Sequence, residues 1–97
     1  MRVITGTARG TKIETLAGLD VRPTADRVKE ALFSILQFEL EGRRVLDLFA
    51  GSGQLGIEAL SRGAAQAVFV DASRESVELV KRNLARTHLE KQARVVS

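Results

Sequence analysis

The residues best suited to chemistry form a glycine-rich segment between an apolar run and a helical pattern. Residues 51–56 read Gly-Ser-Gly-Gln-Leu-Gly and match the spacing G-x-G-x-x-G. In this context Gly51 permits a sharp turn, Gly53 lets a ligand approach the backbone, and Gly56 allows a helix to pack closely on a sheet. The helix that follows directs its positive N-terminal end toward the ligand. The spacing therefore predicts a loop that binds an adenosine-containing cofactor.

Two aspartates flank this segment and narrow the choice of cofactor. Asp71 follows Gly51 by about 20 residues, at the end of a second apolar run, where a carboxylate accepts hydrogen bonds from both hydroxyls of an adenosine ribose and repels a 2′-phosphate. Asp47 lies inside the first apolar run, where it would repel a pyrophosphate but suits the ammonium and sulfonium groups of S-adenosylmethionine. S-adenosylmethionine is therefore favoured over a dinucleotide. A structural role stays open for each side chain. Asp71 could instead mark the start of the next helix, and Asp47 could accept hydrogen bonds from backbone amides of the loop.

These residues need a scaffold, and the pattern from residue 44 onward predicts one. Apolar runs at 45–50, 67–70 and 93–96 alternate with helical patterns at 54–62 and from the N-cap Ser73 onward. The order strand, helix, strand, helix, strand predicts an α/β fold, the first half of a doubly wound parallel sheet. The nearly continuous apolar run 45–50 is typical of a strand covered on both faces. With the strand order 3-2-1, this strand is an open edge within these 97 residues.

The first 40 residues predict an extension in front of that sheet. Residues 2–5 and 11–15 alternate like strands on either side of a glycine-flanked turn, which indicates a β-hairpin. Residues 24–36 indicate an amphipathic helix with Thr24 as its N-cap and with apolar residues at 28, 31, 32, 35 and 36 as its buried stripe. We expect residues 1–40 to form the hairpin and a covering helix, and residues 41–97 to form the first half of the cofactor-binding domain.

Composition excludes several other kinds of site. The chain has no cysteine and one histidine, which excludes a thiol nucleophile, a disulfide framework and a cysteine or histidine-cluster metal site. No apolar run approaches the roughly 20 residues of a membrane-spanning helix, and no signal-peptide core follows the first residues. We therefore expect a cytoplasmic, metal-free protein without a membrane partner. The net charge of +3 is compatible with a nucleic-acid partner but does not by itself indicate one.

Three stretches of the chain resemble a known enzyme family. They read ITGTARGTKI at 4–13, RPTADRVKEALF at 22–33 and VLDLFAGSGQLGIEALSRG at 45–63. Together they resemble the N-terminal half of the bacterial small-subunit ribosomal RNA guanine-N2 methyltransferases of the RsmD type. The second stretch distinguishes this family from other methyltransferases best, because many methyltransferases share the glycine segment. The resemblance runs through essentially the whole chain, although these enzymes are about twice as long.

The resemblance implies a Rossmann-like fold of S-adenosylmethionine-dependent methyltransferases, with its first three parallel strands present. It also implies transfer of a methyl group to the exocyclic N2 amine of a guanine in small-subunit rRNA, so the partner is that rRNA or its assembly particle. By resemblance, residues 47–53 line the methionine side of S-adenosylmethionine and Asp71 holds the ribose. The candidate cofactor residues are Thr24, Asp47, Phe49, Ala50, Gly51, Ser52, Gly53, Asp71 and Ala72. The candidate RNA contacts are Arg2, Arg9, Lys12, Arg22 and Arg27, with surface pairing to Asp26 or Glu30 as the alternative for Arg27.

The same resemblance implies that the catalytic residues come after Ser97, outside this sequence. The family holds the acceptor amine with an Asn/Asp-Pro-Pro-aromatic loop after the fourth strand, and Pro23 is the only proline here. We therefore expect no catalytic residue among the 97 and no turnover by this chain alone. We also expect self-association or exchange of elements through the edge 45–50.

Two alternative functions stay open. An NAD-binding oxidoreductase fragment fits the glycines and Asp71 but leaves Asp47 and the stretch 22–33 unexplained. A non-catalytic RNA-binding or assembly module fits the basic hairpin but lacks an aromatic stacking platform.

Overall fold

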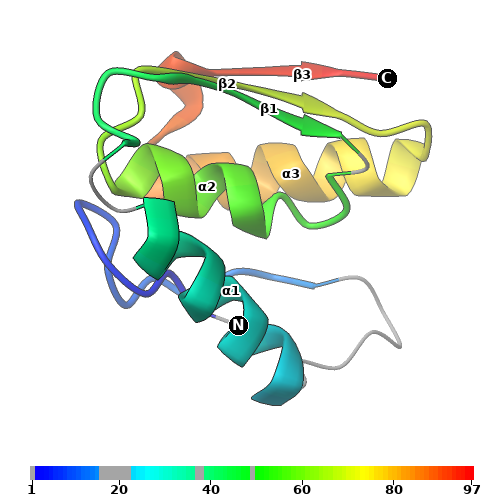
Figure 1. The fold of residues 1–97 in the computed structure, drawn as a ribbon. Helices are drawn as coiled ribbons and strands as arrows, with labels where there is room; N and C mark the ends of the chain where they lie inside the picture. Colours follow the sequence, from blue (N-terminus) through cyan, green and yellow to red (C-terminus); the bar gives the residue numbers. More distant parts are fainter. Residues whose placement is uncertain (1, 16–22, 37–38, 49) are drawn as a thin grey trace.

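The described part of the chain folds into three strands and three α-helices (Figure 1). The computed structural model describes residues 2–15, 23–36, 39–48 and 50–97. The elements in chain order are α1 (Pro23–Leu36), β1 (Arg44–Leu48), α2 (Gln54–Ser61), β2 (Gln66–Val70), α3 (Arg74–Thr87), a short 3₁₀ helix (Glu90–Gln92) and β3 (Ala93–Val96). Among the candidate site residues, Phe49, Arg22 and the side chain of Thr24 lie outside the described part. No helix in the described residues is both long enough and apolar enough to cross a membrane.

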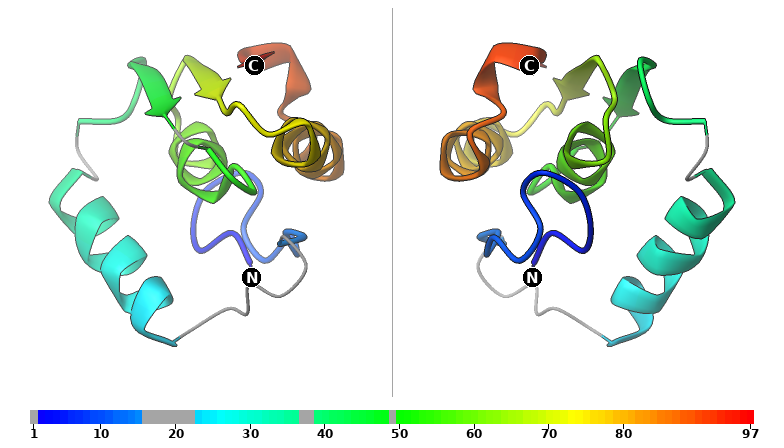
Figure 2. Two further views of the ribbon diagram at one scale, coloured as in Figure 1. Left: turned by 90° about the vertical axis from the view of Figure 1, so that its right-hand side faces the viewer. Right: turned by 90° about the vertical axis from the view of Figure 1, so that its left-hand side faces the viewer.

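The three strands form one parallel sheet in the order β1-β2-β3. Asp47 lies opposite Phe69 and Leu48 opposite Val70, so β1 and β2 end at the same edge of the sheet. Figure 1 and Figure 2 both show α2 and α3 against one face of the sheet. The α/β order predicted from residue 44 onward is confirmed, and so are the strand order and the position of β1 at the edge.

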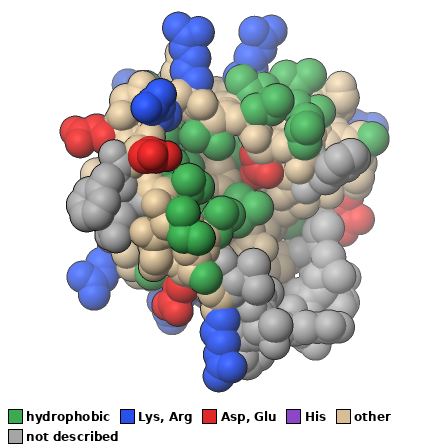
Figure 3. Space-filling model, viewed as in Figure 1, with side chains coloured by type: hydrophobic (Ala, Val, Ile, Leu, Met, Phe, Trp, Pro, Cys, Tyr) green, Lys and Arg blue, Asp and Glu red, His purple; other side chains and the backbone are tan. Residues whose placement is uncertain are grey.

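Within the described residues only one face of this sheet is covered, which differs from the expectation for β1. Its residues Val45 and Asp47 point toward α2, and Asp47 is 7% exposed. Leu46 and Leu48 point the opposite way and are 60% and 57% exposed. Figure 3 shows hydrophobic side chains on the surface over this part of the sheet. The apolar run thus correctly predicted a strand, but in the described chain no layer covers the second face of the sheet.

The N-terminal segment, residues 2–15, lies against the side of α2 and α3 that faces away from the sheet (Figure 2). Instead of a hairpin with two strands it forms one antiparallel bridge between Arg2 and Lys12. The amide of Val3 donates to the carbonyl of Thr11 at 3.0 Å, and the amide of Gly10 donates to the carbonyl of Val3 at 2.9 Å. The predicted turn is therefore present, but the segment is held mainly by α2 and α3 and not by a strand ladder.

Helix α1 is confirmed, but of the described side chains in its predicted buried stripe only Leu36 packs against the core, and residues 31, 32 and 35 are exposed. It begins at Pro23, so Thr24 lies in its first turn and does not precede it as an N-cap. Lys29 and Phe33 are the buried side chains, at 2% and 3% exposure, whereas Ile35 is 77% exposed. The reason is that α2 offers an anion to Lys29 and a guanidinium to Phe33, as described below. These contacts fix the rotation of the helix so that Lys29 and Phe33 face inward.

Candidate functional site

The glycine-rich segment turns the chain from the end of β1 into α2. Ala50 donates its amide to the carbonyl of Val70 at 3.0 Å, which fixes the loop to the end of β2. Gly53 donates to the carbonyl of Ala50 at 2.8 Å, and its own carbonyl accepts the amide of Ile57 at 2.9 Å, the first turn of α2. The loop thus lies at the carboxyl end of the parallel strands, where ligands bind in open α/β sheets.

The three glycines of this loop have different roles. Gly51 has φ +59° and open space on the side where a Cβ would stand. Gly53 has φ +81°, but an added Cβ would stand 3.2 Å from the side chain of Val80, so Gly53 faces the core. The close approach of a ligand predicted for Gly53 is therefore corrected to Gly51, which is the open position. At Gly56 a Cβ would overlap the ring of Phe69. The expectation that Gly56 allows close packing of helix on sheet is confirmed.

Asp71 ties this loop to the start of α3. Its Oδ2 accepts the amide of Gly51 at 3.0 Å, and its Oδ1 accepts the amide of Ser73 at 2.8 Å. These two amides hold the pKa of Asp71 below its ordinary value. Ser73 in turn caps α3, since its Oγ accepts the amide of Ser76 at 3.3 Å. Each carboxylate oxygen of Asp71 keeps a second acceptor position, so an ionised, half-buried acceptor pair remains beside the loop.

Asp47 joins the strand to the helix on the other side of the loop. Its Oδ2 accepts the amide of Gly56 at 3.1 Å, so the structural role left open in the sequence is present. Burial raises the pKa of Asp47 above its ordinary value, the Gly56 amide opposes that shift, and the negative charge of Asp71 adds to it. Asp71 therefore adds to the negative potential at Asp47, which lies on the neighbouring strand. A cation placed between the loop and these carboxylates would offset that potential.

The structure brings most of the candidate cofactor residues to one place. Asp47, Ala50, Gly51, Ser52, Gly53, Asp71 and Ala72 all lie at the carboxyl ends of β1 and β2 or directly after them. Ser52 is buried at 8% exposure, and its carbonyl accepts the side-chain amide of Asn83 at 2.8 Å. Asn83 had no signal in the sequence beyond its position on the inner side of a helix.

The catalytic residues expected beyond Ser97 stay a prediction. Ser97 is exposed and directly follows β3, which pairs with β2 in parallel. Residue 97 therefore lies at the same edge of the sheet as the glycine loop.

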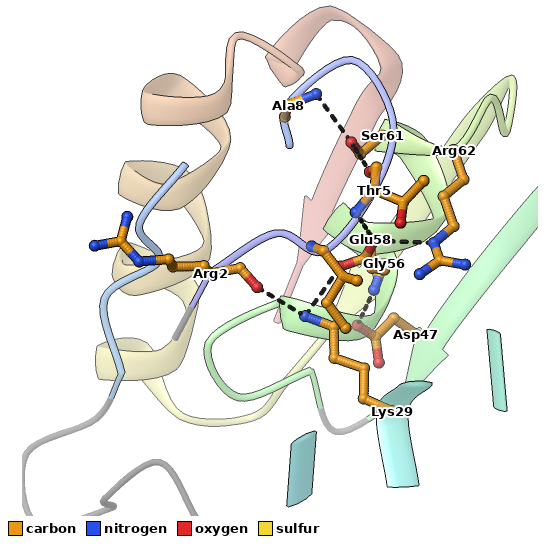
Figure 4. Close-up of polar contacts among 10 residues, drawn as sticks. Arg2, Thr5, Ala8, Lys29, Asp47, Gly56, Glu58, Ser61 and Arg62 are labelled. Atoms are coloured by element: carbon orange, nitrogen blue, oxygen red, sulfur yellow. Dashed lines mark hydrogen bonds and ion pairs between the residues drawn. The ribbon is translucent and has the colours of Figure 1, made fainter. Parts of the chain in front are cut away.

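Glu58 is the most connected charged residue that the sequence did not single out (Figure 4). It is completely buried on α2, where its carboxylate pairs with Lys29 at 3.1 Å and with Arg62 at 2.9 Å. The same carboxylate accepts the amides of Ile4 at 2.8 Å and Thr5 at 3.0 Å. Burial by itself would raise the pKa of Glu58, but these amides, Arg62 and Lys29 outweigh it and lower that pKa. Glu58 therefore joins the N-terminal segment and α1 to α2.

Neighbouring residues of α2 strengthen this junction. Ser61 donates its hydroxyl to the carbonyl of Thr5 at 2.6 Å and accepts the amide of Ala8 at 2.9 Å. The guanidinium of Arg62 lies 4.8 Å from the ring centroid of Phe33, a cation–π distance. Lys29 also donates to the carbonyl of Arg2 at 3.4 Å. Figure 4 shows these groups converging on the second half of α2, while Asp47 meets its first half.

The described RNA candidates are all exposed side chains. Arg9, Lys12 and Arg27 are exposed, and Arg2 donates its Nη1 to the carbonyl of Gly10 at 3.0 Å. Arg2 and Lys12 are bridge partners, so their side chains leave the backbone on the same face. This face of the N-terminal segment carries two neighbouring cations.

A cavity of about 920 Å³ lies away from the candidate cofactor residues. It is lined by residues 4–7 of the N-terminal segment, by Glu30 and Ser34 of α1, by Glu41, by Ser61 at the end of α2, and by Arg62 and Gly63 directly after it. The glycine loop precedes α2, so the cavity and the loop lie at opposite ends of that helix. The glycine loop therefore does not line this cavity.

Comparison with known proteins identifies the group to which this arrangement belongs. The family model described as conserved hypothetical protein 95 matches residues 1–97. The chain belongs to this family. YlbH from Bacillus subtilis is 48% identical over 95 residues, which are 98% of this chain and 52% of YlbH. Ribosomal RNA small subunit methyltransferase D from Escherichia coli is 44% identical over 85 residues, which are 88% of this chain and 43% of that protein.

A solved structure similar to this chain agrees with the fold described above. YhhF from Escherichia coli superposes with a TM-score of 0.86 at 40% identity, covering 99% of this chain and 51% of YhhF. The fold is therefore the Rossmann-like fold of S-adenosylmethionine-dependent methyltransferases, with its first three parallel strands. The resemblance stated from the sequence is confirmed as membership of the RsmD family. The chain spans about half the length of the relatives it matches.

Proposed function

We propose that this chain is the cofactor-binding part of a methyltransferase that uses S-adenosylmethionine to methylate the N2 amine of a guanine in small-subunit rRNA. The observation that carries the cofactor is the placement of two carboxylates, Asp47 and Asp71, at the same edge of the sheet beside an open glycine loop. A ligand with an ammonium and a sulfonium offsets this negative charge, whereas the pyrophosphate of NAD adds to it. Methylation of rRNA is supported by the names of the relatives, and the N2 amine of guanine by the sequence resemblance.

Different residues are proposed to contact different parts of the cofactor. Asp71 offers one free acceptor position on each oxygen, which matches the two hydroxyls of a ribose. Asp47, Ala50, Gly51 and Ser52 are proposed to face the methionine part, with Gly51 as the point of closest approach, and Gly53 is proposed to shape the turn behind them. Phe49, Ala72 and Thr24 complete the proposed set. The sulfonium is a preactivated leaving group, so these residues mainly have to hold it in line with the acceptor and exclude water.

The rRNA is proposed to contact the basic residues of the N-terminal part. Arg2 and Lys12 stand side by side, and Arg9 lies in the turn between them. Arg27 on α1 and Arg22 complete this proposed set. Their charges would meet phosphate groups, which position an RNA without reading its sequence. In the complete protein, labelled methyl incorporation into small ribosomal subunits followed by digestion to nucleosides identifies the methylated base.

Calorimetric titration tests the cofactor assignment directly. We expect S-adenosylhomocysteine to bind this chain and NAD not to bind. Asp71→Asn is expected to weaken S-adenosylhomocysteine about tenfold or more, because it removes hydrogen bonds to a charged acceptor worth about 1.5–3 kcal/mol. Glu75→Gln is the matched control, since it neutralises an exposed carboxylate in the first turn of α3 without touching the loop. Preferential binding of NAD would favour the oxidoreductase alternative instead.

The open edge of β1 is expected to make this chain self-associate. Parallel sheets are normally covered on both faces, and here Leu46 and Leu48 are more than half exposed beside an unpaired strand edge in the described sheet. Replacing both leucines with lysine is expected to weaken dimerisation at least tenfold in sedimentation experiments. Ile35→Lys is the control, because Ile35 is 77% exposed but lies on α1. A wild-type chain that stays monomeric at every concentration would disprove the expectation.

A further inference from the structure

Asn83 is the one side chain that contacts both the proposed cofactor loop and the N-terminal segment through hydrogen bonds in the described residues. It lies on α3 and is completely buried. Its Oδ1 accepts the amide of Glu14 at 2.9 Å, and its Nδ2 donates to the carbonyl of Glu14 at 2.9 Å. The same Nδ2 donates to the carbonyl of Ser52 at 2.8 Å. Both N–H groups of the amide are therefore used, one on each segment.

This arrangement is specific to a carboxamide. Two of the three partners are carbonyl oxygens and the third is an N–H group, so only a side chain with a double donor and an acceptor satisfies all three. In the same place a carboxylate would face two carbonyls without a proton, and an aliphatic side chain would leave all three backbone groups unpaired. The position of Ser52 relative to Glu14 therefore depends on Asn83.

We propose that Asn83 is a positioning residue that couples the cofactor loop to the N-terminal segment, so that binding of S-adenosylmethionine at the loop orders the basic residues proposed to contact rRNA. The inference rests on the proposed function for its ligand. A ligand that fixes Ser52 also fixes the amide of Asn83, and through it the backbone at Glu14, two residues from Lys12. By thermodynamic linkage, an RNA that orders the N-terminal segment then tightens cofactor binding by the same factor.

Two backbone amides of the N-terminal segment, those of Thr7 and Glu14, can be compared with each other. Thr7 donates its amide to the carbonyl of Ser61 at 2.8 Å, so this part of the segment is anchored on α2 and not on Asn83. Ligand binding that merely stabilises the whole fold slows exchange at Thr7 and Glu14 together. Coupling through Asn83 slows exchange at Glu14 more than at Thr7. The ratio of the two separates a positioning role from a purely structural one.

Amide hydrogen exchange of the whole chain, with and without saturating S-adenosylhomocysteine, tests this proposal. We expect the ligand to slow exchange at Gly51, and to slow it at Glu14 about fivefold more than at Thr7, the lower end of typical coupling. In Asn83→Asp the Gly51 amide still responds, but the excess at Glu14 is lost. Glu14→Gln is the control that keeps the excess, because it removes only the exposed ion pairs with Arg82 and Arg86 and leaves the backbone of residue 14 intact.

The outcomes distinguish this inference from the function on which it rests. If Gly51 responds in the wild-type chain but Glu14 responds no more than Thr7, the coupling is overturned and the cofactor assignment stands. If neither Gly51 nor Glu14 responds, the cofactor assignment fails and the coupling fails with it. Both results come from the wild-type chain, so they do not depend on whether Asn83→Asp folds.

Discussion

Replacing Glu58 with glutamine is expected to lower the free energy of unfolding by about 3–5 kcal/mol, the usual effect of removing one partner from a buried ion pair. Lys29 is 2% exposed and would lose the charge that compensates its ammonium. A neutral amide also offers one acceptor oxygen where the carboxylate has two, and Ile4 and Thr5 each donate an amide to a different one. Urea denaturation followed by circular dichroism measures the loss.

The pH dependence of stability provides a second readout of the same residue. The folded-state pKa of Glu58 lies below its ordinary value of 4.5. Its contribution is therefore fully present above about pH 4.5 and is lost as the pH falls through the lower folded-state pKa. Glu58→Gln has no such group, so the difference in stability between wild type and variant is expected to shrink in acid.

Glu30→Gln is the control for Glu58, because Glu30 is an exposed carboxylate on the adjoining helix α1. We expect its effect to stay within about 0.5 kcal/mol. Exchange of the Ile4 and Thr5 amides should rise in Glu58→Gln and not in Glu30→Gln. An unchanged unfolding free energy in Glu58→Gln would mean that Lys29 and these amides find other partners.

The sequence predicted the sheet and the position of the cofactor loop because both depend on local patterns. Alternating strands and helices followed from apolar periodicity, and the role of Gly56 followed from the glycine spacing. The junction around Glu58 could not be predicted in that way. Lys29 and Glu58 look like ordinary surface charges in sequence, and only the packing of α1 and residues 4–8 on α2 buries them together.

The same physical reason explains the wrong face of α1. Apolar spacing predicted the burial of residues 32 and 35, but the described chain leaves both exposed, at 40% and 77%. A buried ammonium must keep a partner, so the pair of Lys29 with Glu58 fixes the rotation of the helix. Periodicity reports which side of a helix is apolar. It does not report a charge partner that comes from a distant segment.

Helix α2 consequently connects the two proposed binding regions. Its first half receives Asp47 through the amide of Gly56, and its second half holds residues 4–8 through Glu58 and Ser61. It contains eight residues and is therefore only about 12 Å long. A displacement of the N-terminal segment on this helix would reach the loop within about two turns. The close contact at Gly6 tests how tightly that segment is held.

Gly6→Ala is expected to destabilise the chain by about 2–4 kcal/mol and to release residues 4–8 from α2. Gly6 has φ +95°, and an added Cβ would overlap the carbonyl of Ser61. That carbonyl accepts the amide of Thr7 at 2.8 Å, so the methyl group and the hydrogen bond compete for one position. The backbone of α2 cannot move away from the added methyl group, because Glu58 in the same half of the helix is held by several hydrogen bonds and ion pairs. Denaturation and exchange at the Thr7 amide measure the effect.

Gly10→Ala is the matched control for this contact. Gly10 also has a left-handed conformation, with φ +83°, but an added Cβ would meet nothing within 4 Å. Its cost is therefore limited to backbone strain of about 1–2 kcal/mol, without faster exchange at Thr7. The difference between the two variants isolates the close approach of the N-terminal segment to α2. Equal losses in Gly6→Ala and Gly10→Ala would show that conformation alone is responsible and that the segment is not pressed against the helix.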